Sequence, residues 1–131
     1  MATVELNADN FASLIEGTET LFIDFWAAWC GPCRQFAPVF EAASDKHADA
    51  IFAKLDTEAN QEIAMALEIQ SIPTLMAFRG GVLVFRQAGA MNASSFDQLV
   101  EAVKAIDIEE ARQQAAEARA AHEAAQAAEA N

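Results

Sequence analysis

The stretch "FIDFWAAWCGPCR", residues 22–34, holds both cysteines of the 131-residue chain, Cys30 and Cys33, with only two residues between them. It also places an acid, Asp24, inside an otherwise apolar run. In "TLFIDFWA" hydrophobic residues occupy both alternating sets of positions, which is typical of a central strand covered by helices on both faces. We therefore expect Asp24 to be buried and the two cysteines to follow a buried strand.

Strand and helix patterns alternate on both sides of this stretch. A helix is expected after the cysteines, because Phe36, Val39, Phe40 and Ala43 recur at helical spacing. Further along, "RGG" separates two apolar segments, which predicts an antiparallel hairpin. The remaining expected elements are strands at 3–6 and 51–56, and helices at 9–17, 60–68 and 95–106.

The resulting order is β-α-β-α-β-α-β-β-α. Strands that alternate with helices imply parallel pairing, and the late hairpin adds an antiparallel edge. The sequence therefore predicts an α/β fold, a three-layer α/β/α sandwich around a mixed five-stranded sheet. Composition changes abruptly near Asp107, so we divide the chain into a globular body, 1–106, and an Ala/Glu-rich helical extension or tail, 107–131.

Charge and composition exclude several functional classes. The formal net charge is −12, and the few Lys and Arg residues are scattered, which argues against binding to nucleic acid or to an anionic membrane. The start "MATVELNADNF" lacks the features of a secretory signal, so a cytoplasmic protein is expected. Disulfides are rare in that compartment unless they are catalytic or redox-sensing.

The cysteine pair lies where thiol chemistry is favoured. At the start of a helix, unpaired N–H groups and the positive end of the dipole stabilise a thiolate. We expect Cys30 to be the acidic, exposed attacking thiol and Cys33 to resolve the mixed disulfide. A zinc site is disfavoured because only His47 and His122 remain as soft ligands, so no metal is expected. Haem attachment is disfavoured because Arg34 stands where histidine is needed, and a purely structural two-residue bridge would stabilise little.

Asp24 has two interpretations. Burial raises the pKa of a carboxyl group, so Asp24 is a proton acceptor for Cys33 in the interpretation we favour. Lys54 lies in the middle of the next expected strand and faces Asp24 if the two strands pair. In the alternative interpretation, Asp24 and Lys54 form a buried ion pair with only a structural role.

The motif "WCGPC" at 29–33, joined to "SIPT" at 71–74, resembles the thioredoxin family, and the similarity covers about residues 3–106. The resemblance implies a thioredoxin-like fold with a cis proline at Pro73. It implies that Cys30 is the nucleophile and Cys33 the resolving thiol, with Asp24 as buried base beside Lys54. It also implies an apolar substrate-binding surface that consists of Trp29, Gly31, Pro32, Ile72, Pro73, Gly89 and Ala90.

By this resemblance the protein is a thiol–disulfide oxidoreductase that reduces protein disulfides through a reversible Cys30–Cys33 disulfide. No bound cofactor is expected; electrons come from NADPH through a separate thioredoxin reductase, the expected partner beside disulfide-containing proteins. Two alternatives stay open. One is an oxidase or isomerase of the same family, and the other is a thioredoxin-fold binding subunit with idle thiols.

The tail favours helix by composition and has few large apolar side chains to bury. It is expected to prolong the final helix into solvent, with an Ala-lined ridge that packs against a partner or a second copy as the alternative. A monomer is expected. His47 and His122 are both expected to be exposed and inert.

Overall fold

The computed structural model describes residues 2–130. Its elements, in chain order, are β1 (Val4–Glu5), α1 (Phe11–Gly17), β2 (Thr20–Trp26), α2 (Gly31–Lys46), β3 (Ile51–Asp56), α3 (Gln61–Ala66), β4 (Thr74–Arg79), β5 (Val82–Ala88), α4 (Ala93–Lys104) and α5 (Ile108–Ala130). The order predicted for the body is confirmed up to α4. One further helix, α5, then follows.

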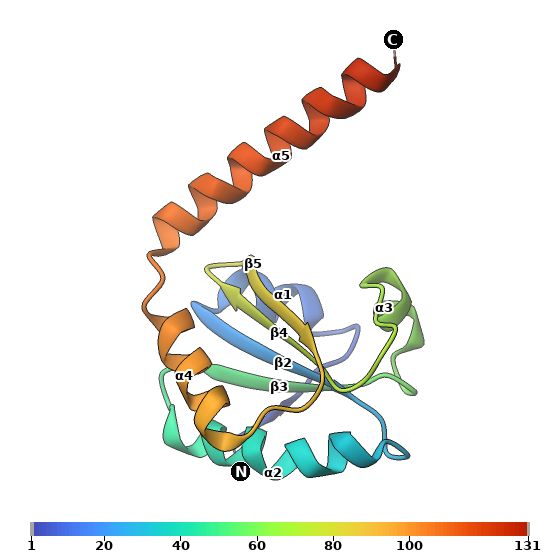
Figure 1. Cartoon of the computed structure of the whole chain (residues 1–131), viewed down its shortest axis with the longest axis vertical. Helices are drawn as coiled ribbons and strands as arrows, with labels where there is room; N and C mark the ends of the chain where they lie inside the picture. Colours follow the sequence, from blue (N-terminus) through green and yellow to red (C-terminus); the bar gives the residue numbers. More distant parts are fainter. Residues whose placement is uncertain (1, 131) are drawn as a thin grey trace.

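The sheet has five strands in the order β1-β3-β2-β4-β5. The first three of these pair in parallel, whereas β4 pairs antiparallel with both β2 and β5. Helices α2 and α4 cover one face of the sheet, and α1 and α3 lie against the other (Figure 1). The predicted mixed sheet between two helical layers is confirmed, and β2 lies at its centre.

Phenylalanine rings form the core between the sheet and helices α2 and α4. Phe22 of β2 stacks on Phe52 of β3 with ring centroids 5.1 Å apart. Phe96 of α4 contacts Phe36 and Phe40 of α2 at centroid distances of 5.4 and 5.7 Å. Each such aromatic pair adds about 0.5–1.5 kcal/mol beyond the area it buries. This packing fixes α2, and with it the helix end that carries the cysteines.

The alternation predicted for β2 is confirmed. Leu21, Ile23 and Phe25 belong to the cluster on the side of α1 and α3, whereas Phe22 belongs to the phenylalanine core. Asp24 alternates with Ile23 and Phe25, so it shares the face of Phe22, the face that α2 covers.

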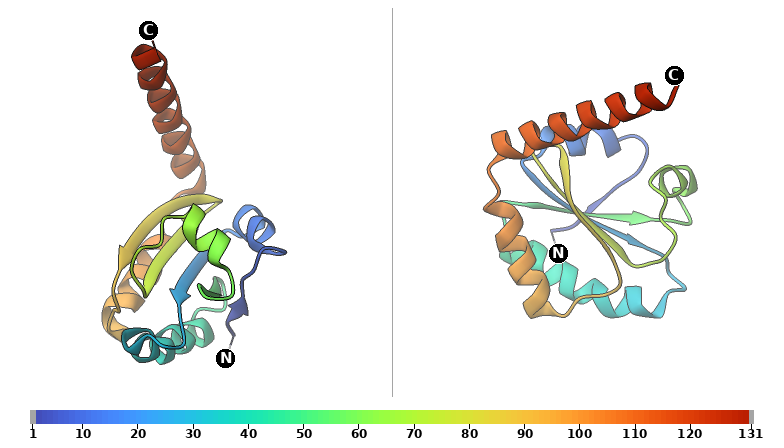
Figure 2. Two further views of the ribbon diagram at one scale, coloured as in Figure 1. Left: turned by 90° about the vertical axis from the view of Figure 1, so that its right-hand side faces the viewer. Right: turned by 45° about the horizontal axis from the view of Figure 1, so that its top comes forward.

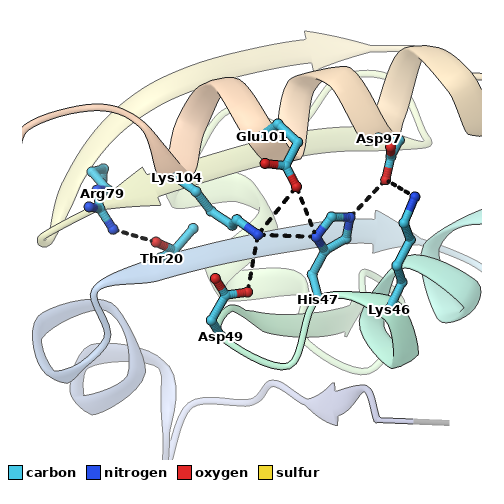
Figure 3. Close-up of polar contacts among 8 residues, drawn as sticks. All are labelled: Thr20, Lys46, His47, Asp49, Arg79, Asp97, Glu101 and Lys104. Carbon is cyan, nitrogen blue, oxygen red and sulfur yellow. Dashed lines mark hydrogen bonds and ion pairs between the residues drawn. The ribbon is translucent and has the colours of Figure 1, made fainter.

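The expectation of an exposed His47 is wrong. His47 follows α2 directly, and α4 packs across this end of the helix, so that the ring is only 4% exposed. Its Nε2 lies 2.7 Å from Oδ1 of Asp97, and its Nδ1 lies 3.2 Å from Nζ of Lys104 and 3.4 Å from Oε1 of Glu101 (Figure 3). The bond with His47 is the main cause that lowers the pKa of Asp97. His47 therefore joins α2 to α4. His122, in contrast, is exposed as expected.

The tail is a separate helix rather than a prolongation of α4. Helix α4 ends at Lys104, and α5 begins at Ile108 after a short break in which the Asp107 carboxylate accepts a hydrogen bond from the Glu109 N–H at 3.2 Å. The later turns of α5 extend away from the body (Figures 1 and 2). Over residues 2–130, no helix has both the length and the apolar character needed to cross a bilayer.

The first turns of α5 are attached to the turn between β4 and β5. Arg112 donates from Nε to the carbonyl oxygen of Gly80 at 3.0 Å, and Ala111 is buried. A Cβ atom added at Gly80 would collide with Cγ2 of Ile108, so the glycine allows this close approach. The base of the tail is thus packed, whereas residues 116–130 are exposed.

Candidate active site

The two cysteines lie between the end of β2 and the first turn of α2. Cys30 is the N-cap residue of α2, with extended backbone angles, and its Sγ accepts a hydrogen bond from the Cys33 N–H at 3.2 Å. The two residues form a disulfide bond, with Cα atoms 5.2 Å apart. Pro32 lies in the first turn of the helix, where the missing N–H costs little. The predicted position of Cys33 inside the first turn is confirmed.

The expectation that the Cys30 side chain is exposed is wrong for the disulfide form. Cys30 is 4% exposed and Cys33 3% exposed, so burial does not distinguish the expected attacking cysteine from the resolving one. The sulfur of Cys30 is bonded to Cys33 and lies 3.6 Å from the carbonyl oxygen of Ile72, which limits its access to water. In contrast, the side chain of Trp29, directly before the pair, is 67% exposed.

The segment that precedes β4 lies against the disulfide. The Ile72-Pro73 peptide bond is cis, as the resemblance implied, and the Ile72 carbonyl oxygen is the atom next to the Cys30 sulfur. The Gly89 N–H donates to the Pro73 carbonyl at 2.8 Å. Gly89 has φ +105, a conformation that favours glycine, and Ala90 after it is exposed. Residues from three distant parts of the chain therefore meet at the disulfide.

Asp24 is buried, as predicted, with 1% of its surface exposed. Among residues 2–130, neither carboxyl oxygen of Asp24 has a hydrogen-bond partner. Burial raises the pKa of Asp24 to about 7, although the nearby charge of Lys54 opposes this effect. A carboxyl group with this pKa can accept and return a proton near neutral pH.

Lys54 lies directly opposite Asp24 in the parallel pairing of β2 with β3, as predicted. Its ammonium group lies 3.8 Å from the Glu41 carboxylate and 5.1 Å from the centre of the Trp26 ring. The ion pair of Lys54 in the described chain is therefore with Glu41 of α2, a residue that the sequence analysis did not single out. A charged residue in the middle of a strand needs such a partner, but its spacing does not identify which acid supplies it.

Glu58 is a second residue that sequence reasoning missed. The indole Nε1 of Trp29 donates a hydrogen bond to Oε1 of Glu58 at 2.7 Å. Glu58 follows β3, and β3 is parallel to β2, so the chain segments after both strands emerge at the same end of the sheet. The parallel pairing of β2 and β3 was therefore the feature from which the proximity of Glu58 to Trp29 could have been predicted. The bond holds an exposed aromatic ring in place beside Cys30.

The arrangement supports thiol–disulfide exchange. The backbone N–H that bonds the Cys30 sulfur, together with the helix dipole, favours a thiolate at this position once the disulfide is reduced. Within the described part of the chain, no group of three or more His, Cys, Asp or Glu side chains could hold a metal ion. The hydrogen-bonding groups next to the Cys30 sulfur are the backbone N–H of Cys33 and the backbone carbonyl of Ile72.

Comparisons with known proteins agree with this geometry. Residues 2–105 match the family model described as Thioredoxin. A relative from Streptomyces coelicolor is 44% identical over 119 residues, which cover 91% of this chain and 89% of the relative. The bifunctional thioredoxin reductase/thioredoxin of Mycobacterium leprae is 42% identical over 90 residues, which cover 67% of this chain and 20% of that protein.

A solved structure gives the same result. The thioredoxin of Plasmodium falciparum aligns with a TM-score of 0.70 and 33% identity, over 76% of this chain and 97% of that one. The family match ends at residue 105, so the whole of α5, which begins at Ile108, lies beyond it. With its mixed sheet, its disulfide at the start of α2 and these relatives, the chain belongs to the thioredoxin family and is a thiol–disulfide oxidoreductase.

Proposed function

We propose that this protein reduces disulfide bonds in other proteins and is returned to its dithiol form by a thioredoxin reductase that draws electrons from NADPH. The observation that carries the proposal is the position of Cys30. Its sulfur caps the 16-residue helix α2 and accepts a hydrogen bond from the Cys33 N–H. The positive end of the helix dipole and the Cys33 N–H favour the thiolate of Cys30, which is the form of cysteine that attacks a disulfide.

The reaction has two exchange steps. The Cys30 thiolate attacks one sulfur of the substrate disulfide, which forms a mixed disulfide and releases the other substrate sulfur as a thiolate. Cys33 then loses its proton and attacks the Cys30 sulfur, which forms the Cys30–Cys33 bond and releases the second substrate thiolate. Two electrons pass to the substrate, and the product is the disulfide form that the structure contains.

Asp24 is the base that we assign to the second step. Its burial and its raised pKa of about 7 make its carboxylate a stronger proton acceptor than an ordinary aspartate. Among the described residues no hydrogen bond joins the carboxyl group directly to a side chain, so a water molecule is the carrier that we propose between Asp24 and Cys33.

The substrate-binding surface is the exposed rim around the disulfide. Trp29 and Pro32 are exposed beside Cys30, and Ile72 contributes backbone groups next to its sulfur. An extended substrate segment can pair with such backbone groups, as in other complexes in which a peptide lies along an exposed chain. The name of the Mycobacterium leprae relative joins a reductase to a thioredoxin, which supports a thioredoxin reductase as electron donor.

The test uses the reduced protein, insulin as a disulfide-containing substrate, and a Cys33→Ser variant. Wild type should precipitate reduced insulin chains catalytically with NADPH and a thioredoxin reductase. The variant should stall as a mixed disulfide on Cys30, visible as an added mass that dithiothreitol removes. A Cys30→Ser variant should form no such adduct. Lack of insulin reduction by wild type would contradict the proposal.

A further inference from the structure

The turn after α3 has an unusual backbone. Glu68 has φ +55, in the left-handed region that non-glycine residues seldom adopt. The Ile69 N–H bonds the Ala64 carbonyl at 2.9 Å, and the Glu68 N–H bonds the Met65 carbonyl at 3.0 Å. This pair of bonds is a Schellman motif, in which glycine is the usual residue at the left-handed position. With glutamate there, the turn needs support from elsewhere.

Arg86 supplies that support from β5. Its Nη1 donates to the carbonyl oxygen of Leu67 at 2.6 Å, and its Nη2 donates to that of Glu68 at 2.7 Å. The planar guanidinium group thus holds two consecutive carbonyl groups at the end of α3, where a positive charge also suits the helix dipole. Among the described residues, Arg86 is the side chain that donates hydrogen bonds to these two carbonyl groups, and no second side chain does so.

The residue that follows β5 holds the other end of this segment. Residues 67–73 run from the Schellman turn to the cis proline, and the N–H of Gly89, the residue directly after β5, donates to the Pro73 carbonyl. Between these two attachments lies Ile72, whose carbonyl oxygen is 3.6 Å from the Cys30 sulfur. Strand β5 and the residue directly after it therefore hold both ends of the segment that contacts the reactive sulfur, through Arg86 and Gly89 respectively.

We propose that Arg86 is a positioning residue for protein substrates, because it holds the 67–73 segment, and with it the backbone of Ile72, in the geometry that a substrate chain pairs with. This inference depends on the proposed function. Arg86 is itself exposed and lies outside the phenylalanine core, so its side chain acts through the segment rather than through the stability of the sheet.

The decisive comparison sets a protein substrate against a small one. In Arg86→Leu, the KM for insulin should rise about tenfold with kcat within about twofold of wild type, a size typical of two lost hydrogen bonds at an exposed site. Reduction of a small disulfide such as 5,5′-dithiobis(2-nitrobenzoate), which does not pair with Ile72, should be unchanged. Arg86→Lys, which keeps one point charge, should have a KM for insulin between those of wild type and Arg86→Leu. Arg119→Leu, on the exposed part of α5, is the matched control.

A second variant separates positioning from loss of folding. Glu68→Gly relieves the left-handed conformation, so in the Arg86→Leu background it should restore much of the insulin KM. Backbone hydrogen exchange gives a readout without any activity: the amide of Ile69 should exchange about tenfold faster in Arg86→Leu than in Arg119→Leu.

Three results would overturn the inference: equal insulin KM in the two leucine variants, equal losses toward insulin and the small disulfide, or unchanged exchange at Ile69. If wild type fails to reduce insulin, the proposed function fails, and the exchange at Ile69 still decides whether Arg86 holds the segment. If wild type is active and Arg86→Leu matches it, only the inference about Arg86 fails.

Discussion

Replacing Asp24 with asparagine should make the protein more stable at neutral pH and leave its stability near pH 4 little changed. The carboxyl group has its ordinary pKa of 3.8 when the chain is unfolded and a pKa of about 7 when burial surrounds it. Because the folded-state pKa is the higher one, folding favours the protonated acid. The contribution of the Asp24 carboxyl group to the free energy of unfolding is fully present below pH 3.8 and is lost as pH rises through about 7.

The size of the loss follows from the two pKa values. At about 1.36 kcal/mol for each pKa unit, the buried carboxyl group costs about 4 kcal/mol once pH exceeds the folded-state value. Asparagine resembles the neutral acid in size and carries no charge, so the variant avoids this cost. The difference in stability between variant and wild type should therefore grow by about 4 kcal/mol from pH 4 to pH 8.

Urea unfolding of the oxidised proteins, followed by tryptophan fluorescence at pH 4, 5, 6, 7 and 8, measures this difference. Asp9→Asn, at an exposed acid before α1, is the matched control. Its difference in free energy of unfolding from wild type should not change with pH. A flat difference for Asp24→Asn as well would show that folding does not change the protonation of Asp24. The argument from burial, and with it the role of base, would then be wrong.

Three other variants give further checks. At pH 7, Asp24→Asn should slow the release of mixed disulfides by about 100-fold in stopped-flow measurements, the usual contribution of a general base; an unchanged rate would refute that role. Glu58→Leu, which removes the acceptor for the Trp29 indole, should raise the KM for insulin about threefold, whereas Glu58→Gln keeps an acceptor oxygen and should not. Gly80→Ala should lower stability by about 1–3 kcal/mol because of its positive φ and its contact with α5, and by less in a chain that lacks residues 108–131; equal effects would contradict the packing of the tail.

The fold and the centre of the site were accessible from sequence because their signals are local. Alternation within β2 predicted both the two-sided burial of the strand and the buried Asp24, and the spacing of Phe36 and Phe40 predicted the helix after the cysteines. The positions of Cys30 and Cys33 at the start of that helix followed from the same pattern.

The residues that escaped prediction make contacts between distant parts of the chain. Glu41, Glu58 and Arg86 look like ordinary surface residues, because nothing in their neighbourhood in the sequence marks which partner tertiary packing brings to them. His47 was misjudged for the same reason, since its burial depends on α4, which lies about 50 residues away in the chain.

The attachment of α5 has a practical consequence. The helix is anchored at the β4–β5 turn, and Arg79, just before that turn, pairs with Thr20 at the start of β2, whereas Cys30 follows the other end of that strand. At about 1.5 Å per residue, the 23 residues of α5 form a spacer of about 35 Å. A bead, electrode or fused protein joined to the far end of α5 would connect to the molecule at the end of the sheet remote from the thiols. Helix α5 is therefore a suitable handle for immobilising the protein in working form.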